Sequence, residues 1–273
     1  MMSDIDLEHW SQLAAKHRAP MNWRLFYARL LEGIDFKGKK VLDIGGGIGL
    51  AATYALAHGA ERATLLEPEA AGSQNRQLIR ARSIREELGL TDRLAIEPCT
   101  LQEFDCHGGN FDVAILEASI NHLDEDAVVS LQESKSAREQ YRAIIIKLGS
   151  LLRPGSTIVI SDCARRNFFG DLGLRNPLVP SIDWQKHQQP KIWIRLFEEC
   201  GFSTPTVRWG IHNTLGSLGR RLLGNAVAFY FISSYFILTM RYDGINPPED
   251  SSLKRTNDSS PQGGNDGSSR HAG

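Results

Sequence analysis

A short glycine-rich segment is the feature of this sequence whose residue types and spacing most clearly suggest chemistry. Gly45, Gly47 and Gly49 follow an apolar run that ends at Ile44. Glycines let the backbone turn sharply and let a ligand approach the main chain, and the free amides of a following helix point toward such a loop. The spacing differs from the dinucleotide fingerprint, whose third glycine comes later. The pattern predicts a strand, a ligand-binding turn and a helix; a tight turn without a ligand is the alternative.

An acidic residue, Glu67, ends the next apolar run. In nucleotide-binding folds, a carboxylate about 20 residues after the glycine loop accepts hydrogen bonds from ribose hydroxyls. An isolated Glu at this position would be a solvated strand end. Together with the glycine loop, it indicates a site for a nucleoside cofactor.

One side chain is the candidate for proton transfer. His122 lies in the segment that follows a later apolar run, and histidine is the side chain best suited to proton transfer at neutral pH. We predict His122 as the candidate base, with a hydrogen-bonding loop histidine as the alternative. Two weaker site candidates are Asp162, at a strand end, which could line the substrate side, and His187, in a polar segment, which could be a lid residue. An exposed or structural histidine is the favoured alternative for His187.

Further residues could recognise an acceptor molecule. An anionic group could be bound by three arginines, which are Arg165, Arg166 and Arg175. A solvated basic loop is the alternative for these arginines. An aromatic wall could be formed by three tryptophans, Trp184, Trp193 and Trp209, of which Trp193 has the spacing of a core residue.

Apolar residues occur either in short runs or at helical spacing, and these two patterns predict the strands and helices that must position the candidate residues. Short runs predict strands at 41–44, 63–66, 94–97, 111–116, 157–161, 206–209 and 236–241. Helical spacing and caps predict helices at 8–18, 22–33, 49–58, 70–88, 138–152 and 191–200. Repeated strand–helix units imply a parallel sheet covered on both faces. We therefore predict an α/β protein with a doubly wound seven-stranded sheet, mostly parallel with an antiparallel last strand, and N-terminal helices.

Several segments together resemble motifs of class I S-adenosylmethionine-dependent methyltransferases. Residues 41–49 are similar to the family's first motif, and Glu67 to its ribose-binding acid. Residues 111–117 resemble its fourth strand, and residues 151–160 its Pro-Gly turn and fifth strand. His122 matches a histidine of ubiquinone-pathway methyltransferases.

This resemblance implies a Rossmann-like fold, the cofactor S-adenosyl-L-methionine and methyl transfer to a small acceptor, which could be hydrophobic or lipid-like. O-methylation is favoured, and C- or N-methylation is the alternative. An NAD-dependent reductase is a further alternative. The glycine spacing counts against a reductase, as does the lack of a Tyr-xxx-Lys pair, because Tyr141 is followed by Ile145. A cofactor-binding protein without catalysis is another class.

The resemblance also implies the residues that contact the cofactor. They are Asp43, Gly45, Gly46, Gly47, Gly49, Glu67, Pro68, Cys99, Thr100, Leu101 and Glu117. Asp43 would support the loop, and Glu117 would face the methionine amino group. Cys99 stands where many relatives carry an Asp that accepts from the adenine amino group. The resemblance therefore leaves that contact to packing by Leu101 or to the amide of Gln102.

The chain divides into three predicted parts. Residues 1–36 are expected to form a helical lid, and residues 37–245 the methyltransferase domain. Long connections at 163–190 and 210–233 are assigned to substrate enclosure, because long loops are usually functional or disordered. Residues 246–273 are rich in Pro, Ser, Asn, Gly and Asp, and such a tail is expected to be disordered.

The second long connection combines a basic start with an apolar body. Residues 210–233 could contact a membrane surface, cover a lipid-like substrate, form a dimer contact or pack in the core. Residues 222–240 carry no charge and have the length of a marginal transmembrane helix. Gly224, Asn225 and two serines interrupt this stretch, which makes a membrane span the less favoured interpretation.

Composition excludes several classes of function. The net charge is −1, whereas nucleic-acid binding rewards a strongly basic face, so no nucleic-acid partner is expected. None of the four cysteines forms a CxxC pair, so neither a metal site nor a redox dithiol is indicated. The first residues are acidic and lack the apolar core of a signal peptide. We therefore expect a cytoplasmic protein, with peripheral membrane contact as the alternative.

Overall fold

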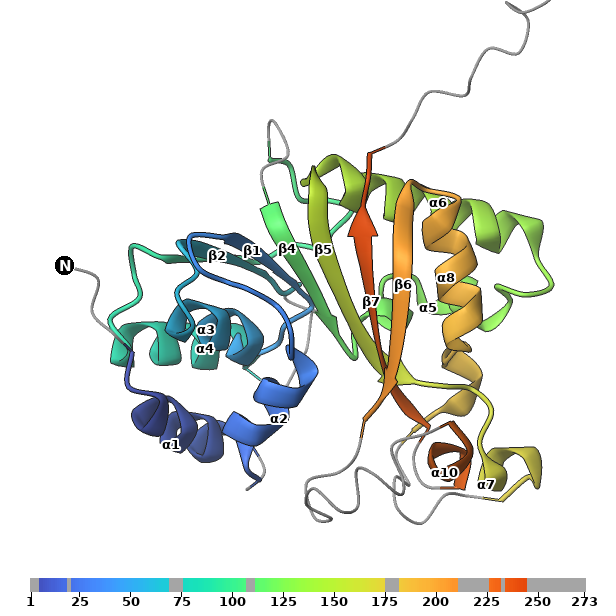
Figure 1. The fold of residues 1–273 in the computed structure, drawn as a ribbon, viewed down its shortest axis with the longest axis horizontal. Coiled ribbons are helices and arrows are strands. Elements are labelled where there is room, and N and C mark those ends of the chain that lie inside the picture. Colours follow the sequence, from blue (N-terminus) through green and yellow to red (C-terminus); the bar gives the residue numbers. More distant parts are fainter. Residues whose placement is uncertain are drawn as a thin grey trace, which may run out of the picture.

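The computed structural model describes residues 5–18, 21–68, 76–106, 111–174, 182–210, 226–231 and 234–244. A single seven-stranded sheet runs through the molecule in the order β3-β2-β1-β4-β5-β7-β6 (Figure 1). Its strands are β1 (Lys40–Ile44), β2 (Arg62–Leu66), β3 (Leu94–Glu97), β4 (Phe111–Glu117), β5 (Leu152–Cys163), β6 (Phe202–Trp209) and β7 (Tyr235–Tyr242). Only β7, the last in the chain, runs antiparallel to its neighbours. The predicted doubly wound sheet is confirmed.

Helices cover both faces of this sheet. One side carries α1 (Leu7–His17), α2 (Trp23–Leu30), α3 (Leu50–Ala57) and α4 (Gln77–Glu87) (Figure 1). The other side carries α5 (Glu125–Val129), α6 (Lys135–Ser150) and α8 (Pro190–Glu198). The shorter elements are the 3₁₀ turns η1 (Ile120–His122) and η2 (Trp184–Lys186), with α7 (Phe168–Asp171) and α10 (Ala226–Phe231) at the lower end of Figure 1.

Successive side chains along each strand point to opposite faces of the sheet, so the protein has two hydrophobic cores, one on each face. In β4, Val113 and Ile115 belong to the core beneath α1–α4, while Ala114 and Leu116 belong to the core beneath α5, α6 and α8. This is the expected consequence of successive side chains pointing to opposite faces. Both faces are apolar because both are covered. The rigid sheet between the cores fixes the strand ends, where the candidate residues lie.

Two strands, β5 and β6, begin well before their predicted first residues, 157 and 206. β5 starts at Leu152, yet Phe111 pairs with Leu152 while Val113 pairs with Thr157, so the intervening Pro-Gly segment is an irregularity in the ladder. β6 likewise starts before the predicted 206, with a register shift between Ser203 and Thr206. Proline has no amide hydrogen to donate to a neighbouring strand. The proline-containing starts of β5 and β6 therefore look like turns in the sequence.

Helix boundaries differ from the predictions at several ends. α6 begins at Lys135 rather than 138, because the Ser134 hydroxyl caps it by accepting a hydrogen bond from the Ala137 amide at 3.2 Å. The predicted helix 70–88 is described from Gln77 onward, and its first residues lie outside the described ranges. So do Arg175, most of 210–233 and the predicted disordered tail.

The N-terminal helices are fixed to the domain by a large aromatic side chain. Trp10 is fully buried, and its indole Nε1 donates a 2.9 Å hydrogen bond to Thr53 Oγ1 on α3. Its ring also packs edge-on against Tyr27 and Tyr54. The role of the N-terminal helices as a lid stays a prediction. In the part of the chain that the structure describes, no helix is long and apolar enough to cross a membrane.

Candidate active site

The glycine loop connects β1 to α3 in a conformation that side chains would prevent. Gly45, Gly47 and Gly49 have φ values of 62°, 59° and 78°, in the region that favours glycine. A Cβ on Gly46 would lie 2.3–2.4 Å from the carboxyl atoms of Asp43, and a Cβ on Gly45 would lie 2.7 Å from Ser119 Cβ. At Gly45 and Gly46 the loop is therefore packed too closely to carry side chains, and it forms the strand–turn–helix connection that the sequence predicted.

Asp43 supports this loop from below. Its Oδ2 accepts a 3.0 Å hydrogen bond from the amide of Ala52 in the first turn of α3. Its other oxygen, Oδ1, is buried without a partner among the described residues. Burial, followed by the nearby charge of Glu117, raises the pKa of Asp43 to about 7. A buried carboxylate of this kind favours a cation nearby.

Glu67 ties the end of β2 to the same loop. Its Oε2 accepts a 2.8 Å hydrogen bond from the Gly47 amide. Burial raises the pKa of Glu67, and the Gly47 hydrogen bond acts in the opposite direction. The carboxylate thus lies at the position that the sequence assigned to a ribose-binding acid.

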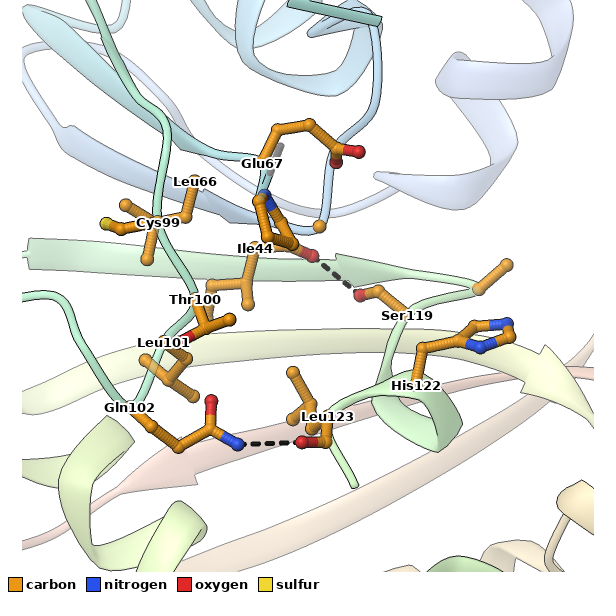
Figure 2. Close-up of a pocket in the computed structure, with 13 residues that line it drawn as sticks. Ile44, Leu66, Glu67, Cys99, Thr100, Leu101, Gln102, Ser119, His122 and Leu123 are labelled. Atoms are coloured by element: carbon orange, nitrogen blue, oxygen red, sulfur yellow. Dashed lines mark hydrogen bonds between the residues drawn. The ribbon is translucent and has the colours of Figure 1, made fainter. Parts of the chain in front are cut away.

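A cavity of about 220 Å³ opens between the ends of β1, β2 and β4 (Figure 2). The predicted contacts that line it are Gly45, Glu67, Pro68, Cys99, Thr100 and Leu101, together with His122. The other predicted contacts, Asp43, Gly46, Gly47, Gly49 and Glu117, are not part of this lining. Segments far apart in the sequence thus meet at one wall, as the parallel topology requires.

The predicted adenine side of the cavity is mainly apolar. Leu101 is buried, and the Cys99 thiol is partly buried. Gln102 donates from Nε2 to the Leu123 carbonyl at 2.7 Å (Figure 2). Thr100 is bonded through its hydroxyl to Glu103 Oε2 at 2.8 Å. Leu101 is therefore available to pack against a ligand in the cavity, whereas the Gln102 amide is already bonded to the main chain.

Two residues that the sequence did not single out complete the wall. Ser119 Oγ donates to the Ile44 carbonyl at 2.6 Å (Figure 2), which joins the β4 loop to the end of β1. Ala118 has a φ of 51°, and its amide donates to the Ser161 carbonyl at 2.8 Å. A left-handed alanine is strained, and such strain is concentrated at functional sites. The sequence did not indicate that Ala118 and Ser119 line a cavity, because two small residues after a strand form no recognisable motif.

Glu117 ends β4 and contacts the N-terminal helices. The Tyr27 hydroxyl donates to Glu117 Oε2 at 2.6 Å, and Arg18 Nη1 lies 3.4 Å from Oε1. Burial and the Glu117 charge raise the pKa of Tyr27 well above its usual value. Glu117 therefore already pairs with a cation, Arg18, and its predicted contact with the methionine amino group stays a prediction.

His122 lies at the rim of the cavity, in a chain of polar contacts with Glu125 and Lys186. Its Nδ1 is 2.6 Å from Glu125 Oε1, and Glu125 Oε2 is 2.6 Å from Lys186 Nζ. Lys186 first, and then His122, lowers the pKa of Glu125. The His122 side chain is 54% exposed. A carboxylate that engages Nδ1 fixes the ring and leaves Nε2 for another partner.

The two weaker candidates form a second histidine–carboxylate pair. His187 Nδ1 lies 2.9 Å from Asp162 Oδ1, and the side chains are only 12% and 2% exposed. The Cys163 amide donates to the same oxygen at 2.8 Å. The structure therefore brings together a strand end and a loop residue that the sequence could only name separately.

A second cavity, of about 440 Å³, lies at the ends of β5–β7. The described residues that line it are Arg166, Gln189, Lys191, Trp209, Val227, Tyr230 and Ser234. Two predicted acceptor residues, Arg166 and Trp209, thus share one cavity. Trp193 is in the core, as predicted, and neither Arg165 nor Trp184 belongs to this lining.

The first cavity and the loop beside it offer groups of the kind that bind a nucleoside cofactor. Gly45 in the lining has no side chain to keep a ligand from the main chain, and the Glu67 carboxylate can accept from hydroxyl groups. Asp43, outside the lining, is a buried carboxylate beneath the loop. Within the described ranges, no group of three side chains could hold a metal ion.

Comparison with known proteins agrees with this geometry. A family model described as a methyltransferase domain matches residues 15–206. No curated protein sequence matches the chain.

Several solved structures share the fold. An S-adenosylmethionine-dependent methyltransferase from Mesorhizobium loti has a TM-score of 0.53 at 16% identity, over 80% of this chain and 96% of that one. Mitomycin 7-O-methyltransferase has a TM-score of 0.53 at 19% identity, over 86% and 59% respectively.

A third similar structure was solved with ligands. A Burkholderia thailandensis 1,6-didemethyltoxoflavin-N1-methyltransferase with bound 1,6-didemethyltoxoflavin and S-adenosylhomocysteine has a TM-score of 0.50 at 19% identity, over 81% of this chain and 77% of that one. At such identities these structures establish likeness of fold.

Proposed function

The chain belongs to the class I S-adenosylmethionine-dependent methyltransferases, and from this premise we propose that it methylates an oxygen atom of a small acceptor, with His122 as the base. The observation that carries the proposal is the His122–Glu125–Lys186 chain at the rim of the cofactor cavity. A histidine oriented by a carboxylate is the usual arrangement for accepting a proton from a hydroxyl nucleophile.

The chemistry divides between the cofactor and the chain. S-adenosyl-L-methionine supplies a sulfonium methyl group, so the protein contributes proximity, alignment and proton transfer. In our proposal, Glu125 accepts the Nδ1–H of neutral His122, which leaves Nε2 to take the acceptor's hydroxyl proton. Lys186 keeps Glu125 charged, because a neighbouring cation favours the carboxylate.

The cofactor-binding set is part of the proposal. Glu67 would hold the ribose, and residues 99–101 would lie beside adenine. Asp43 and the glycines at 45–49 would pass close to the methionine part, and Glu117 would take the amino group in place of Arg18. The hydrogen bonds that Glu67, Asp43 and Glu117 already accept support these roles.

The acceptor is proposed to be partly apolar. Val227 and Phe231 on α10 are 70% and 50% exposed, and Val227 also lines the second cavity. An exposed apolar lip beside a cavity favours an acceptor with apolar surface. The expected peripheral membrane contact of 210–233 falls largely outside the described residues and stays a prediction.

His122→Gln tests the base. We expect this variant to lose about 10²- to 10⁴-fold in methyl transfer to hydroxyl acceptors, measured as S-adenosylhomocysteine formed with a panel of phenols and alcohols. Its affinity for S-adenosyl-L-methionine should stay within about threefold, because the lost group acts on the acceptor. The Glu125→Gln variant should lose less methyl-transfer activity than His122→Gln.

The control variant is His9→Gln, which alters an exposed histidine on α1. Transfer by His122→Gln at the rate of the unchanged protein would refute the base assignment. Transfer only to amines or carbon nucleophiles would favour N- or C-methylation, whose acceptors need no hydroxyl deprotonation.

A further inference from the structure

We propose that the second cavity binds the far end of the acceptor and selects a hydroxylated aromatic carboxylate. This inference rests on the proposed function, since it names the class of acceptor for the same reaction. The carrying observation is a cavity of about 440 Å³ whose lining combines two cations, two aromatic rings and one amide. Among the described residues of this lining there is no carboxylate.

The two cations in the lining of the cavity differ in whether they have an ion pair. Arg166 is already paired, because its Nη2 lies 2.9 Å from Asp171 Oδ2, which also accepts from the Tyr230 hydroxyl at 3.0 Å. Lys191 has no ion pair with any described residue, and it lies outside the shared Asp171 network. Among its described lining residues, the cavity therefore presents one positive charge without an ion pair, that of Lys191, which a single carboxylate would neutralise.

Helix α8 places this lysine in an unusual position. Lys191 is the second residue of α8, directly after Pro190, and the N-cap Gln189 makes no capping hydrogen bond from its side chain. A cation is unfavourable at a helix N-terminus, where the dipole favours anions. An anionic ligand group beside Lys191 would relieve this repulsion and contact both the ammonium and the helix end.

The aromatic part of the lining favours a ring rather than a simple anion. Trp209, at the end of β6, packs edge-on against Phe236 with centroids 6.4 Å apart. Tyr230 packs edge-on against Phe168 and Phe231. These contacts hold both side chains in place, and rings in such positions bind another aromatic group by stacking or edge contact.

The position in the sheet sets the length of the acceptor. Arg166 follows β5, Trp209 ends β6 and Ser234 precedes β7, so these lining residues lie at the sheet edge where β4 also ends, just before His122. Three strand spacings separate β4 from β6 in the order β4-β5-β7-β6, or about 14 Å at about 4.8 Å each. The part of the acceptor that contacts Trp209 must therefore be remote from the hydroxyl that reacts, which requires an extended aromatic skeleton.

Calorimetry on the full chain saturated with S-adenosylhomocysteine tests this inference. The probes are para-hydroxycinnamate, para-hydroxyphenylacetate and a hydroxynaphthoate, each compared with its neutral primary amide at low salt. We expect at least one carboxylate to bind about tenfold more tightly than its amide, as expected for a charge-assisted contact. Lys191→Met should reduce this preference to about twofold or less.

The matched control is Lys135→Met, which alters a lysine in the first turn of α6. This control should keep the carboxylate preference, whereas Trp209→Leu should weaken both members of each pair. Equal binding of carboxylates and amides, or no binding of any probe, overturns the inference. Failure of S-adenosylhomocysteine itself to bind would be seen in the preceding titration, and would instead count against the proposed function.

Discussion

At the scale of single residues, two carboxylates have different tasks at the same loop. Glu67 accepts from the Gly47 amide at the edge of the cavity, while Asp43 is buried beneath the loop and caps α3. Glu67 can therefore exchange partners with a ligand, whereas Asp43 acts through its charge and its support of the backbone. Each role leads to a separate measurement.

Glu67→Gln should weaken cofactor binding. The amide oxygen can still accept from Gly47, but the charge-assisted hydrogen bonds to ribose hydroxyls are lost, at about 1.5–3 kcal/mol. We expect the dissociation constant for S-adenosyl-L-methionine to rise about 10- to 100-fold in calorimetry. Glu61→Gln, at the opposite end of β2, is the control. An unchanged constant in the Glu67 variant would mean that ribose is held elsewhere.

Asp43 should make stability depend on pH. In the unfolded chain this carboxyl loses its proton near its ordinary pKa of 3.8, whereas in the folded protein it keeps its proton up to a pKa of about 7. Between these values the folded state binds the extra proton, so its stability falls as pH rises. The decrease should approach about 4 kcal/mol for a shift of this size.

Urea unfolding from pH 4 to pH 8 would measure this effect. Asp43→Asn should flatten the decline, whereas Asp92→Asn, at an exposed site, should leave it unchanged. A decline of the same slope in Asp43→Asn would assign the pH dependence to another group. S-adenosyl-L-methionine should also bind more tightly as pH rises through 7, because its cation favours the ionised carboxyl.

Site residues differed in how well the sequence revealed them. Glu67 and the glycines were predictable because a local motif carries their roles. The contacts that Lys186 makes with Glu125 and Tyr27 makes with Glu117 were not, since these residues are separated by 61 and 90 positions. Long-range contacts of this kind depend on packing, which no local pattern encodes.

At the scale of elements, the β1–α3 turn depends on close packing. Gly46→Ala would press a Cβ against the Asp43 carboxyl, so the loop must shift. We expect at least about a 100-fold loss of cofactor affinity, since a shift of about 1 Å is enough to lose such a site. Gly38→Ala is the control, because it has a positive φ but nothing within 4 Å of the new Cβ. Wild-type affinity in Gly46→Ala would contradict the close-packed loop.

The elements themselves were predictable to the extent that their patterns are local. All seven strands and their order of appearance follow from apolar runs, and the antiparallel β7 was expected. The short elements α5 and α7 were missed because each is too brief for a periodic signal. The irregular starts of β5 and β6 were missed because proline there resembles a break.

At the scale of the whole molecule, the N-terminal helices are part of the core rather than an appendage. Trp10→Ala should lower the free energy of unfolding by about 3–5 kcal/mol, because a buried aromatic side chain and its hydrogen bond to Thr53 are lost. Ile79→Ala, at an exposed position, should cost little. Unfolding followed by fluorescence and circular dichroism should remain one transition. An early separate transition of the N-terminal helices would indicate an independent lid.

Calorimetric titration of the full chain with S-adenosyl-L-methionine, and separately with NAD, tests the central claim most directly. The glycine cradle, Glu67 and the family match all lead us to expect saturable binding of S-adenosyl-L-methionine at one site per chain, displaced by S-adenosylhomocysteine, with no heat from NAD. Binding of NAD with no heat from S-adenosyl-L-methionine would contradict the account.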